Sequence, residues 1–144
     1  MAREKHETWN RNREPRTPPP RKGDDIAERL EALAAAILDD LLPKLERRWA
    51  SRHVGRQLAR GATGAGSNYE EARGAESRAD FAHKIGVATK ELREARYWLH
   101  LSLRSRTLSH DLPDKDQLRR LAAEADELVA ILTASGRTAK AGAG

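Results

Sequence analysis

The stretch from Arg60 to Phe81, RGATGAGSNYEEARGAESRADF, constrains the fold most, because glycines interrupt a sequence that otherwise reads as helix. Gly61, Gly64 and Gly66 fall within six residues. Each glycine costs a helix roughly 0.5–1 kcal/mol relative to alanine, so three together need a reason beyond local propensity. Close approach of a neighbouring backbone is one reason, and a sharp break in the helix is the other.

The second half of this stretch becomes rich in acids and alanine. Ser77 and Asp80 have the spacing of a capping box, with Asp in the place where Glu is usual. The spacing predicts that a new helix starts near Ser77.

Composition favours helices over strands. Aromatic residues make up 4% of the 144 residues, and alanine and leucine supply most of the apolar ones. Strands are enriched in β-branched and aromatic residues, so the expected class is all-α with a modest core. The chain has no cysteine, which excludes disulfides and thiolate metal sites.

The first predicted helix opens at Asp24 and Asp25, which suit a helix N-terminus. Its apolar residues recur every three or four positions. Pro43 is expected to kink this helix or to end it near Leu42. Leu45 and Trp49 are then expected to plug the end of the core.

Three more amphipathic stretches follow at residues 51–73, 77–105 and 114–135, with Asp114 as a cap and Gly136 as a stop. Together they predict an antiparallel up-down four-helix bundle over residues 24–136. Residues 1–23 read as a disordered, basic, proline-rich tail, and residues 137–144 as a short disordered C-terminal tail. No secretory signal or membrane-spanning run is present, so we expect a cytoplasmic protein.

The net charge of +5 is unevenly distributed, because residues 47–69 contain five arginines and no acid. Arg48, Arg52, Arg56 and Arg60 repeat every four residues, and helical geometry places this arginine row away from the apolar stripe. The row is either a solvated face that pairs with acids of a neighbour or a stripe that tracks nucleic acid phosphates.

Polar and apolar residues off the core stripes are further candidates. Three polar residues, Asn68, Glu70 and Glu71, could join a buried polar network that fixes helix register by meeting an arginine from another helix or subunit, or they could contact a ligand or partner. Tyr97, Trp98 and Leu101 suggest a subunit interface, although side chains folded over the bundle end would give the same pattern.

Catalytic and metal motifs are missing from the sequence. Asp80 and His83 form half of a bundle di-iron motif, but no second pair accompanies them. No P-loop, Rossmann or zinc-protease signature occurs. We therefore expect no enzyme activity, metal or cofactor.

Three segments carry a family resemblance: RQLARGATGAGSNYEEARGAESRADFAHK (56–84), KELREARYWLHL (90–101) and DELVAILTASGRT (126–138). In this order they resemble the four helix bundle protein family, also called the 23S ribosomal RNA intervening-sequence protein family. The resemblance implies an up-down bundle that assembles as a ring, commonly a pentamer, with no known catalytic activity. The related accessory protein of diversity-generating retroelements is a basic barrel that binds nucleic acid and a reverse transcriptase.

The leading hypothesis from the sequence is a non-enzymatic, oligomeric bundle that binds RNA or DNA backbone through its arginines. The alternative is a protein-interaction adaptor or structural scaffold with no nucleic acid role. Partners to test are a second copy of the chain, RNA or DNA, and a reverse transcriptase or other protein.

Overall fold

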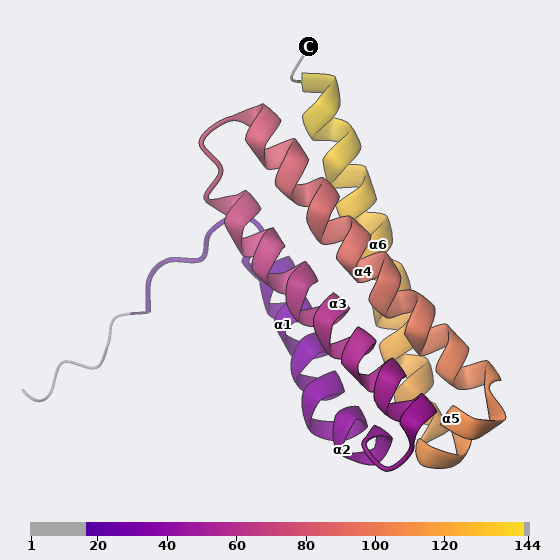
Figure 1. Cartoon of the computed structure of the whole chain (residues 1–144). Coiled ribbons are helices and arrows are strands. Elements are labelled where there is room, and N and C mark those ends of the chain that lie inside the picture. Colours follow the sequence, from indigo (N-terminus) through magenta and orange to yellow (C-terminus); the bar gives the residue numbers. More distant parts are fainter. Residues whose placement is uncertain (1–16, 143–144) are drawn as a thin grey trace, which may run out of the picture.

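The computed structural model describes residues 17–142, and its regular elements are all helical. In chain order they are α1 (Asp24–Ala36), the π-helix η1 (Ile37–Leu41), α2 (Leu42–Leu45), α3 (Trp49–Arg73), α4 (Arg78–Arg104), α5 (Arg106–Asp111) and α6 (Lys115–Gly142). The α1–η1–α2 segment, α3, α4 and α6 alternate in direction, as Figure 1 shows. The predicted all-α class is confirmed, and the alternating directions of the four segments agree with an up-down bundle.

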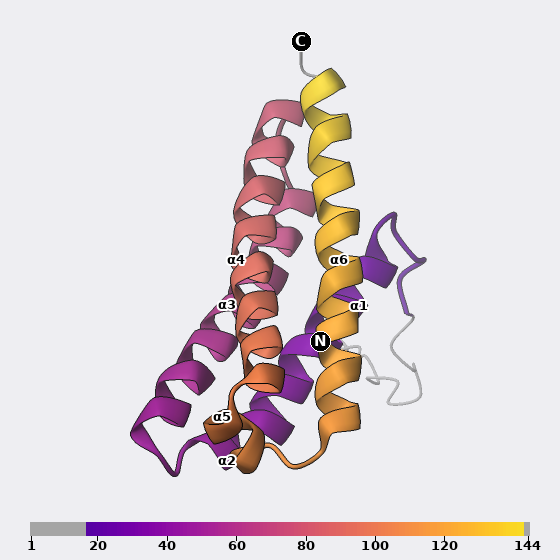
Figure 2. The same ribbon diagram turned by 90° about the vertical axis from the view of Figure 1, so that its right-hand side faces the viewer.

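The four helical segments pack unequally. Helix α4 lies between α3 and α6, whereas α1 covers only part of the bundle's length (Figure 2). The apolar stripes predicted from periodicity form the core, and its largest fully buried side chains come from all four segments: Leu30, Ile37, Leu41, Leu45, Leu58, Ile85, Leu92, Leu99, Leu118, Leu128 and Leu132.

The small-residue stretch does not break α3, so the structure favours close approach over a sharp turn. A Cβ added to Gly61 would lie 2.9 Å from the carbonyl oxygen of Glu91 and 3.1 Å from the backbone nitrogen of Ala95. Gly61 therefore lets the backbones of α3 and α4 approach closely. Gly66 instead faces α1, where an added Cβ would meet only Leu30, at 4.0 Å.

Two predicted helix caps are confirmed. The Ser77 hydroxyl accepts a hydrogen bond from the backbone N–H of Asp80 at 3.1 Å, at the start of α4. The Asp114 carboxylate accepts one from the N–H of Gln117 at 2.9 Å, at the start of α6. These bonds satisfy donors that the first helical turn leaves unpaired.

The predicted stop at Gly136 is wrong, and so is the predicted disorder of residues 137–142; the last two residues of that predicted tail lie outside the described residues. Helix α6 continues to Gly142, because its last turns pack against the start of α4. Ala139 is buried there, and a Cβ on Gly136 would make ordinary contact with Ile85 at 3.4 Å. Packing against α4 outweighs the local cost of one glycine.

Pro43 does not end the first helical segment. The helix widens into the π-turn η1, in which the Leu42 N–H donates to the Ile37 carbonyl, and α2 follows with the proline in its first turn. A proline ring clashes with the carbonyl four residues before it, and a π-turn relieves that clash. Leu45 is buried as expected, but Trp49 is 83% exposed and plugs nothing.

The N-terminal tail prediction lies mostly outside the described residues, since the description begins at Thr17. Residues 17–20 are exposed and have no regular structure. Gly23 then caps α1 with a φ of +85°, where an added Cβ would lie 2.6 Å from the Tyr69 hydroxyl. Glycine is required at this entry into the bundle. No helix in the described range is both long and apolar enough to cross a membrane.

Candidate interaction surfaces

The arginine row lies on the outward side of α3, as the four-residue repeat predicts, but most of it is paired within the chain. Arg60 contacts Glu94 of α4 at 2.5 Å, Arg48 contacts Asp111 at 3.5 Å, and Arg52 contacts Glu46 at 3.7 Å. The side chains of Arg48, Arg52 and Arg60 are 45–58% exposed. Pairs at such exposure contribute about 0–1 kcal/mol each, so solvent or another anion can replace them.

Arg56 differs from the other members of the row. It is exposed and forms no ion pair with any residue from 17 to 142. The positive charge of the row is therefore largely balanced by carboxylates, and Arg56 is the member available to a partner.

A second surface, the α3–α4 face, runs beside the close contact made by Gly61. We define it by Arg56 and Arg60 from α3 and by Glu91, Glu94, Tyr97 and Trp98 from α4. The carboxylate of Glu91 packs over Gly64, where an added Cβ would lie 3.2 Å from its Oε2 atom. That Oε2 atom and Nε1 of Trp98 are both buried without a hydrogen-bond partner in the described chain.

Aromatic side chains complete the α3–α4 face. Trp98 stands edge-on to His53 at 5.7 Å between ring centroids and to Tyr97 at 4.9 Å. Tyr97 is 57% exposed, whereas Trp98 and Leu101 are partly buried and pack on the core. Of the three predicted interface residues, Tyr97 is the one that projects furthest from the bundle.

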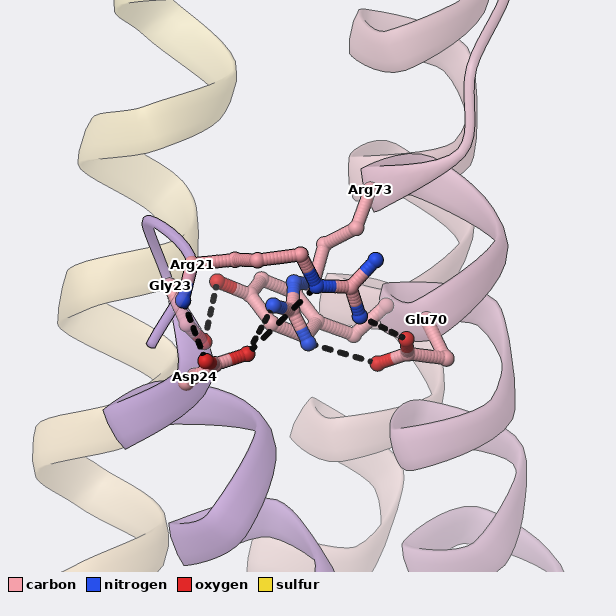
Figure 3. A network of polar contacts seen from close by, with 6 residues as sticks. Arg21, Gly23, Asp24, Glu70 and Arg73 are labelled. Atoms are coloured by element: carbon pink, nitrogen blue, oxygen red, sulfur yellow. Dashed lines mark hydrogen bonds and ion pairs between the residues drawn. The ribbon is translucent and has the colours of Figure 1, made fainter. Parts of the chain in front are cut away.

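Of the three residues predicted to join a polar network, Glu70 does pair with arginines, although its side chain is 54% exposed. Asn68 and Glu71 do not join it. Asn68 donates to the Gly64 carbonyl of its own helix at 2.8 Å, and Glu71 is exposed. The network that contains Glu70 lies where α1 begins, and Figure 3 shows it. There Arg73 bonds both Asp24 and Glu70, and Arg21 also reaches Glu70, at 3.4 Å.

This network ties the start of α1 to the end of α3. The Arg73 side chain is only 9% exposed. The pKa of Asp24 is lowered, first by the backbone N–H of Arg21 and then by the Arg73 side chain. An arginine in the last turn of a helix gave no signal in the sequence that it would meet the first turn of α1.

Metal-binding geometry is missing from residues 17–142, where no group of three His or acidic side chains is suitably placed. The half-motif residue Asp80 pairs with Lys84 at 3.2 Å, and that bond lowers its pKa. His83 lies exposed on α4.

A known protein family matches almost the same residues as the helical bundle. The family model described as "23S rRNA-intervening sequence protein" matches residues 25–134, nearly the whole bundle. The chain belongs to this family.

A solved structure agrees with the assignment to the intervening-sequence family. The chain is similar to a protein of unknown function from the S23 ribosomal protein family of Bacteroides thetaiotaomicron VPI-5482, with 28% identity and a TM-score of 0.65. The match covers 76% of this chain and 95% of the other. No curated protein matches this chain.

Proposed function

We propose that this member of the intervening-sequence family is a self-assembling helical scaffold without catalytic activity, and that its α3–α4 face packs against another copy. The observation that carries the proposal is a pair of buried polar atoms on that face, Glu91 Oε2 and Trp98 Nε1, that have no hydrogen-bond partner among residues 17–142. A buried polar group without a partner costs about 1–3 kcal/mol. A small adjustment of these side chains on assembly would give both groups partners.

Exposed groups on the same face support the proposal. Tyr97 presents a large amphipathic ring, and tyrosine and arginine are enriched where proteins meet. Arg56 adds a cation with no acid partner in the described part of the chain. Together they supply an aromatic anchor and a charge that a second protein surface can neutralise.

An acidic surface on the same chain is the complement to Arg56. Five exposed carboxylates along the first helical segment form no ion pair within the described residues: Asp25, Glu28, Glu31, Asp39 and Asp40. A contact between the α3–α4 face of one copy and this acidic surface of the next is heterologous, and such contacts form a ring when the rotation between copies closes and a filament when it does not. The family resemblance leads us to expect a pentamer.

Sedimentation velocity tests the proposal with a double variant, Arg56→Glu/Tyr97→Ala. Both side chains are exposed, so the variant should fold normally by circular dichroism. We expect the wild-type chain to sediment as an oligomer and the variant as a species near the 16.1 kDa mass of one chain.

The matched control is Arg120→Glu, which reverses an exposed charge on α6 that forms no ion pair with residues 17–142. It should assemble like the wild type. A folded double variant that retains the wild-type mass would place the contact elsewhere and defeat the proposal.

Binding of nucleic acid backbone by the arginine row is a second candidate function. The observation in its favour is that the row stays about half exposed and that its ion pairs are weak enough to be exchanged for phosphate. The neutralising carboxylates count against a strong site. Anisotropy titrations at several salt concentrations test it: Arg52, Arg56 and Arg60 changed together to Gln should weaken binding and flatten its salt dependence. An unchanged curve would rule the row out.

A further inference from the structure

Trp49 is the most exposed large apolar side chain of the described residues, at 83%. It is the first residue of α3, and at 100° per residue it lies roughly 140° from Val54 and 180° from Leu58, both in the core. The indole therefore points away from the bundle for a geometric reason. Tryptophan buries a large area wherever it finds a partner, so this exposed indole is a candidate contact for another molecule, and its neighbours decide which kind.

The same geometry places Trp49 in line with the arginine row. Arg56 and Arg60 lie within about 20° of it around the helix, over a length of about 16 Å. The outward side of α3 thus begins with an aromatic ring and continues with guanidinium groups. A positively charged surface combined with an aromatic side chain on which a base can stack is typical of proteins that bind single-stranded nucleic acid.

Positively charged side chains without an ion-pair partner among the described residues lie close to Trp49 in the sequence. Residues 44–53, which we call the Trp49 hairpin, contain four bases and one acid. Glu46 forms an ion pair with Arg52, and the nearly buried Asp111 forms one with Arg48. Lys44 and Arg47 form no ion pair with any described residue, and both are exposed. The surplus positive charge of this region therefore lies within five residues of Trp49.

We infer that the Trp49 hairpin binds single-stranded nucleic acid, with an unpaired base stacked on the Trp49 indole and neighbouring phosphates at Lys44 and Arg47. Duplex DNA or RNA hides the faces of its bases, so an exposed indole has nothing to stack on along a helix. The inference rests on the second candidate function and names its substrate class. It moves the main contact from the neutralised row to the end of the bundle beside α5 (Figure 1).

Anisotropy titrations with a labelled oligo(dT), an oligo(U) and a DNA duplex of equal length test the inference on the full chain. We expect wild type to prefer both single strands. Trp49→Ala should weaken single-strand binding at least fivefold and leave the salt slope unchanged, because stacking carries no net charge. Trp49→Phe, which keeps a ring, should retain most of the affinity.

Charge variants test the proposed phosphate contacts of Lys44 and Arg47. Lys44→Gln/Arg47→Gln should reduce the slope of log affinity against log salt by about 1.4, since each single-strand phosphate contact contributes about 0.7. The matched control, Arg137→Gln/Lys140→Gln, removes two exposed cations from the C-terminal end of α6 and should leave the slope unchanged.

Failure of the Trp49 inference can be distinguished from failure of nucleic acid backbone binding in general. Wild-type binding that is insensitive to Trp49→Ala, or equal for duplex and single strand, overturns the inference and leaves backbone binding in place. If the wild-type chain binds none of the three probes at low salt, both the Trp49 inference and the second candidate function are wrong. Trp49-dependent binding to phosphatidylserine vesicles with none to the oligonucleotides would assign the hairpin to membranes and likewise overturn the inference.

Discussion

Replacing Gly61 with alanine tests the close approach of α3 to α4. The added methyl group would lie 2.9 Å from the Glu91 carbonyl oxygen, 3.1 Å from the Ala95 nitrogen and 3.2 Å from the Ala95 Cβ. Two of these atoms belong to the α4 backbone, which cannot rotate away as a side chain can. The helices must therefore separate by several tenths of an ångström, and the contacts around them loosen.

The expected magnitude follows from two opposing effects. Overpacking a well-packed site costs typically about 1–3 kcal/mol. Replacing glycine by alanine within a helix returns roughly 0.5–1 kcal/mol. We expect Gly61→Ala to lower the free energy of unfolding by about 1–2 kcal/mol. The matched control is Gly86→Ala on α4, where an added Cβ meets nothing within 4 Å, so that variant should gain about 0.5–1 kcal/mol.

Urea unfolding followed by far-ultraviolet circular dichroism measures both variants, at one protein concentration because assembly adds to apparent stability. The two changes should have opposite signs. If Gly61→Ala proved as stable as the wild type or more so, while Gly86→Ala gained stability, the backbones would not be in the contact described.

Two further variants test single interactions. Glu124 accepts hydrogen bonds from Arg29 at 2.7 and 2.9 Å, and these bonds lower its pKa in the folded state. The resulting stability is present above the unfolded pKa and is lost as pH falls through the folded one. Glu124→Gln should therefore lower the free energy of unfolding by on the order of 1 kcal/mol at pH 7 and by progressively less in acid. Urea titrations at successive pH values measure this difference, which should vanish at low pH. A difference that is independent of pH would refute the assignment. Ser77→Ala removes the α4 cap and should cost about 1 kcal/mol in the same assay, whereas Ser77→Asp should retain most of the stability. Equal losses for Ala and Asp would mean that capping is not the role of Ser77.

The sequence predicted those features of the fold that depend on neighbours along the chain. Periodic leucines identified the buried faces, and Ser77 and Asp114 identified two helix starts. The error at Gly136 arose where a distant element decides, because Ile85 and its neighbours on α4 support the end of α6. Trp49 could have been placed correctly from its angle to Val54 alone.

The candidate surfaces were less accessible from sequence. A four-residue repeat shows that the arginine row faces outward, but it does not show that Glu94 and Asp111, at least 34 residues away, meet Arg60 and Arg48. The unpartnered atoms of Glu91 and Trp98 likewise depend on how α3 and α4 pack. Long-range pairing of charges carries no periodic signal that a single sequence reveals.

The mass of the wild-type chain in solution tests the central claim most directly. Light scattering on a sizing column, over a hundredfold range of protein concentration, reports whether copies associate. The proposed scaffold predicts a mass that is a multiple of 16.1 kDa, five times that value if the ring is a pentamer. A single 16.1 kDa species at every concentration, with the helical circular dichroism of a folded bundle, would contradict it.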